Sequence, residues 1–177
     1  MYTIIMKRPT WQATHIGICK LMMERSKCIK YRTGAVITKG DRVLASGYNG
    51  TCSKTVECYD YWREYYIKRI KPMFRNRLTT FKKWKNTAKC KSLHSKWSIN
   101  HEMHAEMNAL RDVTRADIDD TCALYTYLSP CEQCAKNILA YGIKTVYYKT
   151  KYMGRPKGNV GGLEFLQNNG VNCIQYI

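Results

Sequence analysis

Two short segments hold residues whose types and spacing suit a catalytic metal site. Pro130-Cys131-Glu132-Gln133-Cys134 places two thiols at the expected start of a helix, where backbone N–H groups favour thiolates. Such a pair can bind one zinc ion through both sulfurs. His104, at the start of another expected helix, is the third candidate ligand. Three protein ligands leave a fourth position for water, which is the arrangement of a catalytic zinc.

Glu106 supplies the base that such a site needs. It follows His104 by two positions and therefore points beside the metal rather than onto it. A carboxylate there can take a proton from water and pass it first to a ring nitrogen and then to a leaving amine. H-x-E followed by P-C-x-x-C is the signature of zinc-dependent nucleobase deaminases, so the combination indicates that chemistry. A C-x-x-C pair alone would also suit a redox site or a purely structural zinc.

Alternating helices and strands must position these residues. The expected helices cover 11–28, 104–114, 131–141 and 163–169, and the expected strands cover 34–38, 42–47, 123–128, 144–148 and 171–176. The turn Lys39-Gly40-Asp41 joins the first two strands into a hairpin. Strands that alternate with helices in the second half predict an α/β sandwich with some parallel pairing. The 177 residues suggest a single domain.

Basic charge concentrates before the metal motif. Residues 1–50 carry nine Lys or Arg and two Asp or Glu, residues 51–100 carry thirteen and three, and residues 101–177 carry eight of each. The middle stretch is rich in Tyr and Trp but poor in aliphatic residues. We therefore expect an insertion at about 51–100 that packs on the core, with helices at 59–70 and 74–91. A basic field attracts phosphates, although most surface lysines have no partner.

The cysteines and the hydropathy indicate a cytoplasmic protein. Nine cysteines at irregular spacing favour metal ligands or buried thiols over disulfides, and Cys19, Cys122 and Cys173 are expected in the core. No apolar run reaches about eighteen residues, so no membrane span is expected. Lys7 and Arg8 follow the apolar N-terminal stretch, which is the wrong order for a secretory signal.

The chain resembles the phage-type deoxycytidylate (dCMP) deaminases of the cytidine deaminase superfamily. The resemblance spans most of residues 20–150 and implies a three-layer α/β/α sandwich around a mixed five-stranded sheet. It implies conversion of dCMP to dUMP for thymidylate synthesis, with Asn49 and Ala105 as substrate contacts. It also implies a homohexamer activated by dCTP, which Mg²⁺ could accompany, and inhibited by dTTP. The matching segments are Arg25-Ser26-Lys27-Cys28, Gly34-Ala35-Val36-Ile37, Gly47-Tyr48-Asn49-Gly50, His104-Ala105-Glu106-Met107-Asn108-Ala109 and residues 128–144.

The resemblance further implies a second, structural zinc. Cys28, Cys58, Cys90 and His94 align with the family's four ligands, with Cys90 where the family has a histidine. Cysteine binds zinc equally well, and Cys90 and His94 are four positions apart, on one face of a helix. Such a zinc would anchor an insertion that is poor in aliphatic residues. His101 and Cys52 are alternative ligands, and buried cysteines with a surface histidine are the simpler explanation.

Recognition of a nucleotide rather than a nucleoside needs cations or backbone amides at the pocket mouth. Lys54 and the loop from Lys151 to Lys157 are the candidates. Tyr152 lies where the family tends to keep a tyrosine near the bound nucleotide. An ordinary basic loop would explain each of these positions equally well.

Two other functions compete with this hypothesis. A tRNA or other nucleic-acid adenosine deaminase shares the zinc motif, and its substrate would explain the basic charge. In that family the asparagine loop lies close to the H-x-E helix, whereas Asn49 and His104 are 55 positions apart here. A non-catalytic nucleic-acid-binding protein on the same fold would have no use for Glu106. We therefore expect dCMP, rather than nucleic acid or a membrane, as the partner.

Overall fold

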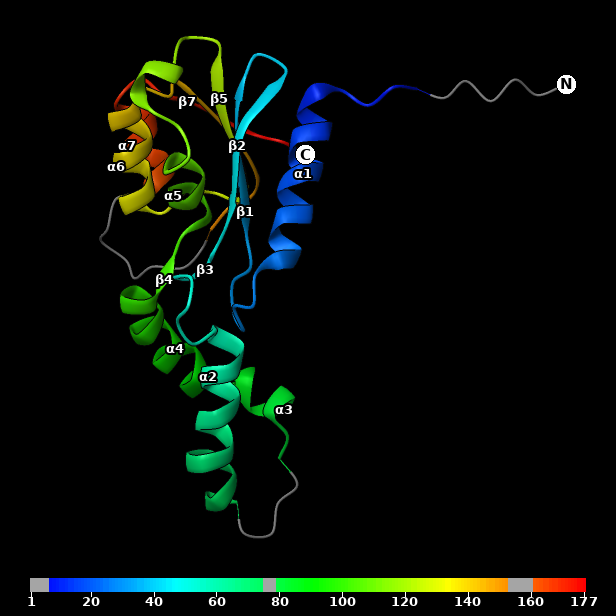
Figure 1. Cartoon of the computed structure of the whole chain (residues 1–177), viewed down its shortest axis with the longest axis vertical. Coiled ribbons are helices and arrows are strands. Elements are labelled where there is room, and N and C mark those ends of the chain that lie inside the picture. Colours follow the sequence, from blue (N-terminus) through cyan, green and yellow to red (C-terminus); the bar gives the residue numbers. More distant parts are fainter. Residues whose placement is uncertain (1–6, 75–78, 153–160) are drawn as a thin grey trace, which may run out of the picture.

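A mixed five-stranded sheet forms the centre of the molecule (Figure 1). The computed structural model describes residues 7–74, 79–152 and 161–177. The strand order is β2-β1-β5-β6-β7; β1 runs antiparallel to both β2 and β5, whereas β5, β6 and β7 are parallel. The predicted mixed sheet is confirmed. Its strands are β1 (Gly34–Lys39), β2 (Arg42–Tyr48), β5 (Cys122–Leu128), β6 (Thr145–Thr150) and β7 (Asn172–Gln175).

Helices cover both faces of the sheet, as the α/β/α prediction requires (Figure 1). The helix α1 (Trp11–Arg25) packs on one face, against β1 and β5. Because successive side chains of a strand point to opposite faces, Val36 packs beneath α1 while Ala35 and Ile37 pack beneath the opposite helices. The helices on that opposite face are α5 (Ala105–Leu110), α6 (Glu132–Tyr141) and α7 (Gly162–Asn168).

The close approach of β2 to α5 depends on Gly47. A Cβ at this position would lie 2.4 Å from the carbonyl oxygen of Ala105 and 2.6 Å from the amide nitrogen of Ala109, so no side chain fits. Asn108 Nδ2 donates a hydrogen bond of 2.8 Å to the carbonyl oxygen of Tyr48 and reinforces the contact. These contacts hold the start of α5, where His104 and Glu106 lie, against the sheet.

The insertion forms a helical arm that projects from the sandwich (Figure 1). Its interior is aromatic rather than aliphatic, since Trp62, Trp84 and Trp97 pack in one buried cluster. The predicted helix at 74–91 is wrong. The hydroxyl oxygens of Thr80 and Thr87 accept hydrogen bonds from downstream amides and begin two separate helices, and residues 75–78 lie outside the described ranges. The elements are α2 (Cys58–Tyr65), η1 (Tyr66–Ile70), η2 (Lys71–Met73), α3 (Phe81–Lys85) and α4 (Ala88–His101).

A short ladder closes the insertion beside the sheet. The strand β3 (Gly50–Thr51) pairs antiparallel with β4 (Glu102–Met103), so the chain returns to the point where it left the sandwich. His104 follows β4 directly, and the insertion therefore ends at the metal motif. Within the described ranges, no helix combines the length and the apolar character needed to cross a membrane.

Candidate active site

His104, Cys131 and Cys134 converge at the starts of two helices. His104 is the N-cap residue of α5, Cys131 is the N-cap residue of α6, and Cys134 lies in the first turn of α6. Nδ1 of His104 is 3.3 Å from Sγ of Cys131 and 3.3 Å from Sγ of Cys134. The three ligand atoms all lie within 4.8 Å of one another, as one tetrahedral ion would require. The structure thus brings together the first predicted ligand set.

Hydrogen bonds among the three ligands shift their pKa values in different directions. Those with Cys134 and His104 lower the pKa of Cys131 to about 3. The hydrogen bond with Cys131 raises the pKa of His104 to about 9, and it also raises the pKa of Cys134. A divalent cation competes with protons for thiolate and imidazole ligands, so this donor set fits zinc.

Glu106 lies beside the same group without joining it. Its side chain is buried, and burial raises the pKa of its carboxyl group above the ordinary value. It forms a hydrogen bond with Cys134 and lines the same cavity as His104 and Cys131. A buried carboxyl group next to a metal-ligand set is the arrangement that a proton shuttle needs.

A cavity of about 520 Å³ opens beside Glu106 and His104. That volume lies within the range of roughly 300–1,000 Å³ that is usual for small-molecule sites. Its lining comes from the metal motif, the segment 28–33, Asn49, the elements α4 and β4 of the insertion, and the residues at the carboxyl ends of β5 and β6. Neither the sandwich nor the arm alone would enclose this space.

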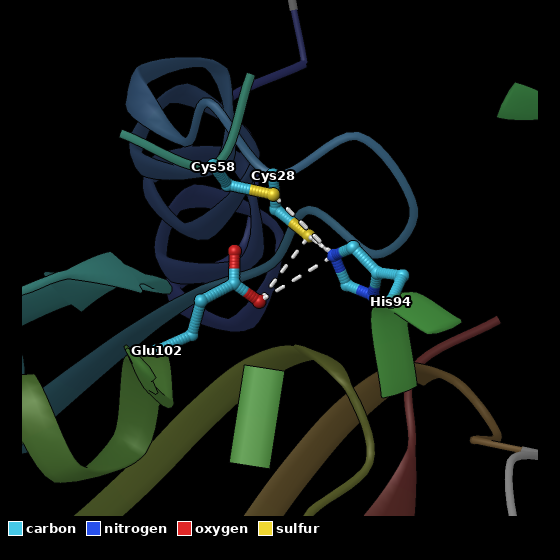
Figure 2. Close-up of side chains that lie close together, drawn as sticks. All are labelled: Cys28, Cys58, His94 and Glu102. Atoms are coloured by element: carbon cyan, nitrogen blue, oxygen red, sulfur yellow. Dashed lines mark hydrogen bonds and ion pairs between the residues drawn. The ribbon is translucent and has the colours of Figure 1, made fainter. Parts of the chain in front are cut away.

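A second cluster lies in the wall of the same cavity and joins the arm to the sandwich (Figure 2). Nε2 of His94 is 3.3 Å from Sγ of Cys28 and 3.4 Å from Sγ of Cys58, and 3.8 Å from Oε2 of Glu102. Oε2 of Glu102 also lies 3.5 Å from Sγ of Cys28. These four side chains come from four different segments, yet their ligand atoms lie within 4.8 Å of one another. They form a compact set of four donors.

The donor chemistry of this second cluster also fits a metal ion. The hydrogen bond with Cys58 lowers the pKa of Cys28 to about 4, and the same bond raises the pKa of Cys58. Burial raises the pKa of Glu102 to about 8. Oε1 of Glu102 is buried without a hydrogen-bond partner among the described residues, which is costly for a polar atom unless an ion satisfies the group. A closed set of four ligands is typical of structural zinc.

The predicted ligand Cys90 does not reach this cluster. It is fully buried among the aromatic residues of the arm, one helical turn before His94, and Glu102 occupies the fourth position instead. The alternatives His101 and Cys52 also lie outside the cluster. Glu102 was not predicted as a ligand because the resemblance implies only cysteine and histidine ligands. A signal was present, since Glu102 is the single acidic residue between positions 65 and 105.

Asn49 lines the cavity and organises its wall. Its Oδ1 accepts a hydrogen bond of 2.8 Å from the amide of Thr33, and its Nδ2 donates one of 2.7 Å to the carbonyl oxygen of Tyr31. Tyr31 and Thr33 line the cavity as well. The Asn49 amide keeps one further lone pair and one further N–H, so it can still contact a bound sugar.

The remaining predicted substrate contacts differ in position. Tyr152 lines the cavity, and its amide donates a hydrogen bond of 2.8 Å to Oγ of Ser129. Ala105 is fully buried at the start of α5, outside the described lining. Lys54 lies in an exposed turn after β3, with φ of 66°, outside that lining, and it has no hydrogen bond, ion pair or ring contact to a described lining residue, so the structure does not support it as a phosphate ligand. Residues 153–157 of the predicted basic loop are outside the described ranges.

A mixed sheet with a His-Cys-Cys group and a buried glutamate at two helix starts defines the class of cytidine deaminase-like enzymes. Residues 9–150 match the family model described as "Cytidine and deoxycytidylate deaminase zinc-binding region". The chain belongs to this deaminase family, and it is accordingly a hydrolase.

Individual relatives agree with the predicted phage-type resemblance. The deoxycytidylate deaminase of Enterobacteria phage T4 is 33% identical over 92% of this chain and 88% of its own length. That of Enterobacteria phage T2 is 32% identical over 92% of this chain and 90% of its own length. The crystal structure of dCMP deaminase from the cyanophage S-TIM5 in complex with dCMP and dUMP has a TM-score of 0.62 at 24% identity, and the match covers 97% of this chain and 100% of that chain. This structure supports the fold.

Proposed function

We propose that this enzyme hydrolyses dCMP to dUMP and ammonia. The observation that carries the proposal is the His104, Cys131 and Cys134 group with Glu106 in the wall of the same cavity. The kinship with phage deoxycytidylate deaminases supplies the substrate. The reaction consumes one water: the amino-bearing ring carbon gains the oxygen, and its nitrogen leaves as ammonia.

We assign metal binding, proton transfer and sugar binding to different side chains according to their positions. His104, Cys131 and Cys134 would hold zinc, which when bound lowers the pKa of a water molecule and makes it a nucleophile at neutral pH. Glu106 accepts a proton from that water and delivers it to the ring nitrogen next to the amino-bearing carbon. It then takes the remaining proton of the former water from the new hydroxyl group on the ring carbon and gives it to the amine, which leaves as ammonia. Asn49 holds the wall formed by Tyr31 and Thr33 in position and offers its remaining amide groups to the sugar.

A substrate panel tests this function. We expect the zinc-loaded protein to convert dCMP faster than deoxycytidine, dCTP or an adenosine in a tRNA stem-loop, with dUMP as the product on a chromatogram. Turnover of the stem-loop without turnover of dCMP would replace this function with nucleic-acid deamination. A protein that binds nucleic acid and deaminates nothing would refute catalysis altogether.

We also propose that Cys28, Cys58, His94 and Glu102 bind a second, structural zinc. The support is a compact cluster of four donors from four segments, together with the orphaned oxygen of Glu102. This ion would tie α2, α4 and β4 to the segment after α1. Metal analysis of the purified protein should give about two zinc ions per chain, whereas one per chain would remove this site.

Regulation and assembly are proposed on the family resemblance. We expect a cytoplasmic homohexamer that supplies dUMP for thymidylate synthesis. We expect dCTP, accompanied by Mg²⁺, to activate it and dTTP to inhibit it. Sedimentation gives the oligomeric state directly. Initial rates at low dCMP, with each effector and with or without Mg²⁺, give the sign of the regulation. An unchanged rate with both nucleotides would contradict the regulatory part alone.

A further inference from the structure

The helix α4 of the insertion forms one wall of the active-site cavity. Ser95 and Ser98 both line it. Lys91 precedes Ser95 by one helical turn, and the spacing 91, 95, 98 places all three residues on one face of α4. This face therefore presents the two serines to the cavity, and Lys91 continues it one turn beyond the lining.

Lys91 extends over an aromatic side chain of the cavity wall. Its Nζ lies 5.9 Å from the centroid of the Tyr31 ring. Tyr31 in turn packs edge-on against Tyr152, with ring centroids 5.8 Å apart, and both tyrosines line the cavity. A hydrogen bond with Tyr31 raises the pKa of Lys91, which stays cationic. None of the ion pairs between described residues involves Lys91.

The cavity needs a cation if its ligand is a nucleotide. Among the described residues that line it, none is Lys or Arg, and two, Glu102 and Glu106, are acidic. A phosphate monoester carries close to two negative charges at neutral pH, and leaving them without a partner would oppose binding. The ammonium group of Lys91 lies over the ring of Tyr31, which lines the cavity. The ammonium group of Lys30, in contrast, donates to the carbonyl oxygen of Lys85.

We propose that Lys91, assisted by the hydroxyl groups of Ser95 and Ser98, binds the 5′-phosphate of the substrate. This inference rests on the proposed function and deepens it. The base end of the nucleotide lies at Glu106 and His104, and the phosphate end lies along α4. The insertion thereby gains a role beyond structure: it makes the enzyme selective for nucleotides over nucleosides. A flexible ammonium group with hydroxyl groups beside it is well suited to phosphate oxygens. The Ser98 hydroxyl donates to the carbonyl oxygen of Ser95 at 3.3 Å and would exchange this bond for one to the phosphate.

Kinetics on dCMP and deoxycytidine test this assignment. Lys91→Gln should lower kcat/KM for dCMP about 10- to 100-fold, mainly through KM, because it removes a charge-assisted hydrogen bond. The same variant should leave kcat/KM for deoxycytidine within about twofold. Lys91→Arg should retain much of the dCMP activity. Ser95→Ala should give a smaller loss, again for dCMP alone.

Lys89 provides a matched control on the same helix. It is an exposed lysine two positions away, on a different face of α4, so Lys89→Gln removes the same charge without touching the proposed site. It should behave as wild type with both substrates. Equilibrium binding of dUMP, which requires no turnover, should weaken in Lys91→Gln and not in Lys89→Gln.

The failures of the two proposals can be told apart. If the wild type deaminates dCMP in preference to deoxycytidine and Lys91→Gln keeps that preference, the phosphate assignment is wrong while the function stands. Equal losses on both substrates would also overturn it, since they would indicate a structural role. If the wild type does not turn over dCMP, the proposed function itself fails.

Discussion

Glu102 and His104 are two positions apart in the sequence, yet they belong to different clusters of metal-ligand type and line one cavity. The short strand β4 makes this arrangement possible, because its pairing with β3 fixes Glu102 just before the chain reaches His104. An ion at the second cluster would therefore hold the segment that positions the catalytic ligand. This strand connects the arm to the active site along the chain, in addition to the contact that α4 makes with the cavity.

The Glu102 carboxylate is expected to be essential for the second zinc. Glu102→Ala should reduce the metal content from about two ions to about one per chain. A structural zinc contributes several kcal/mol, so the melting temperature should fall by at least about 10 °C. Metal analysis and thermal unfolding would measure both effects.

Cys90→Ala is the control that tests whether Glu102 or the predicted Cys90 is the fourth ligand. It should cost only about 1 kcal/mol for lost packing, and the second zinc should remain. Loss of an ion from Cys90→Ala, together with its retention in Glu102→Ala, would restore the ligand set predicted from sequence.

The sequence predicted the first metal group because short-range spacing determines it. Cys131 and Cys134 share one helix start, and His104 is next to its own base, Glu106. The second group depends on four segments that only the tertiary structure brings together, and the structure places Glu102 there in place of the predicted Cys90.

The break between α3 and α4 was missed for a local reason: the capping roles of Thr80 and Thr87 compete with a continuous helical pattern. Lys54 was chosen by proximity in sequence to Asn49, which did not translate into proximity to the cavity.

The carboxylate of Glu106 should be required for turnover and not for metal binding. Glu106→Gln keeps the size of the side chain but removes the proton acceptor, so kcat should fall about 10²- to 10⁴-fold. The zinc content should stay at the wild-type value, because Glu106 is not one of the three ligands. Turnover at the wild-type rate in this variant would exclude the proton-shuttle role.

Gly47 should tolerate no side chain. Gly47→Ala would force a Cβ to within 2.4 Å of the Ala105 carbonyl oxygen, and we expect a loss of about 1–3 kcal/mol from the displaced α5. Urea unfolding would measure it. Gly17→Ala is the control: Gly17 lies in α1 with nothing within 4 Å of the added Cβ, so this change should stabilise the protein by about 0.5–1 kcal/mol. Equal effects of the two substitutions would contradict the packing argument.

The basic arm should accelerate capture of an anionic substrate. Positions 65–101 carry eleven Lys or Arg and no Asp or Glu, and α4 from this stretch lines the cavity. Raising the ionic strength from about 10 mM to about 150 mM shortens the screening length from about 30 Å to about 8 Å, so kcat/KM for dCMP should fall severalfold. The uncharged substrate deoxycytidine supplies the comparison, and its kcat/KM should hardly change. A parallel decline for both substrates would point to an effect of salt on the protein itself.

The most direct test of the central claim is the stoichiometry of the reaction with dCMP. Purified protein loaded with zinc is incubated with dCMP, and dUMP and ammonia are measured together. We predict that the two products appear in a one-to-one ratio and that the reaction stops when a chelator strips the zinc. Zinc-loaded, folded protein that leaves dCMP unchanged would contradict the account.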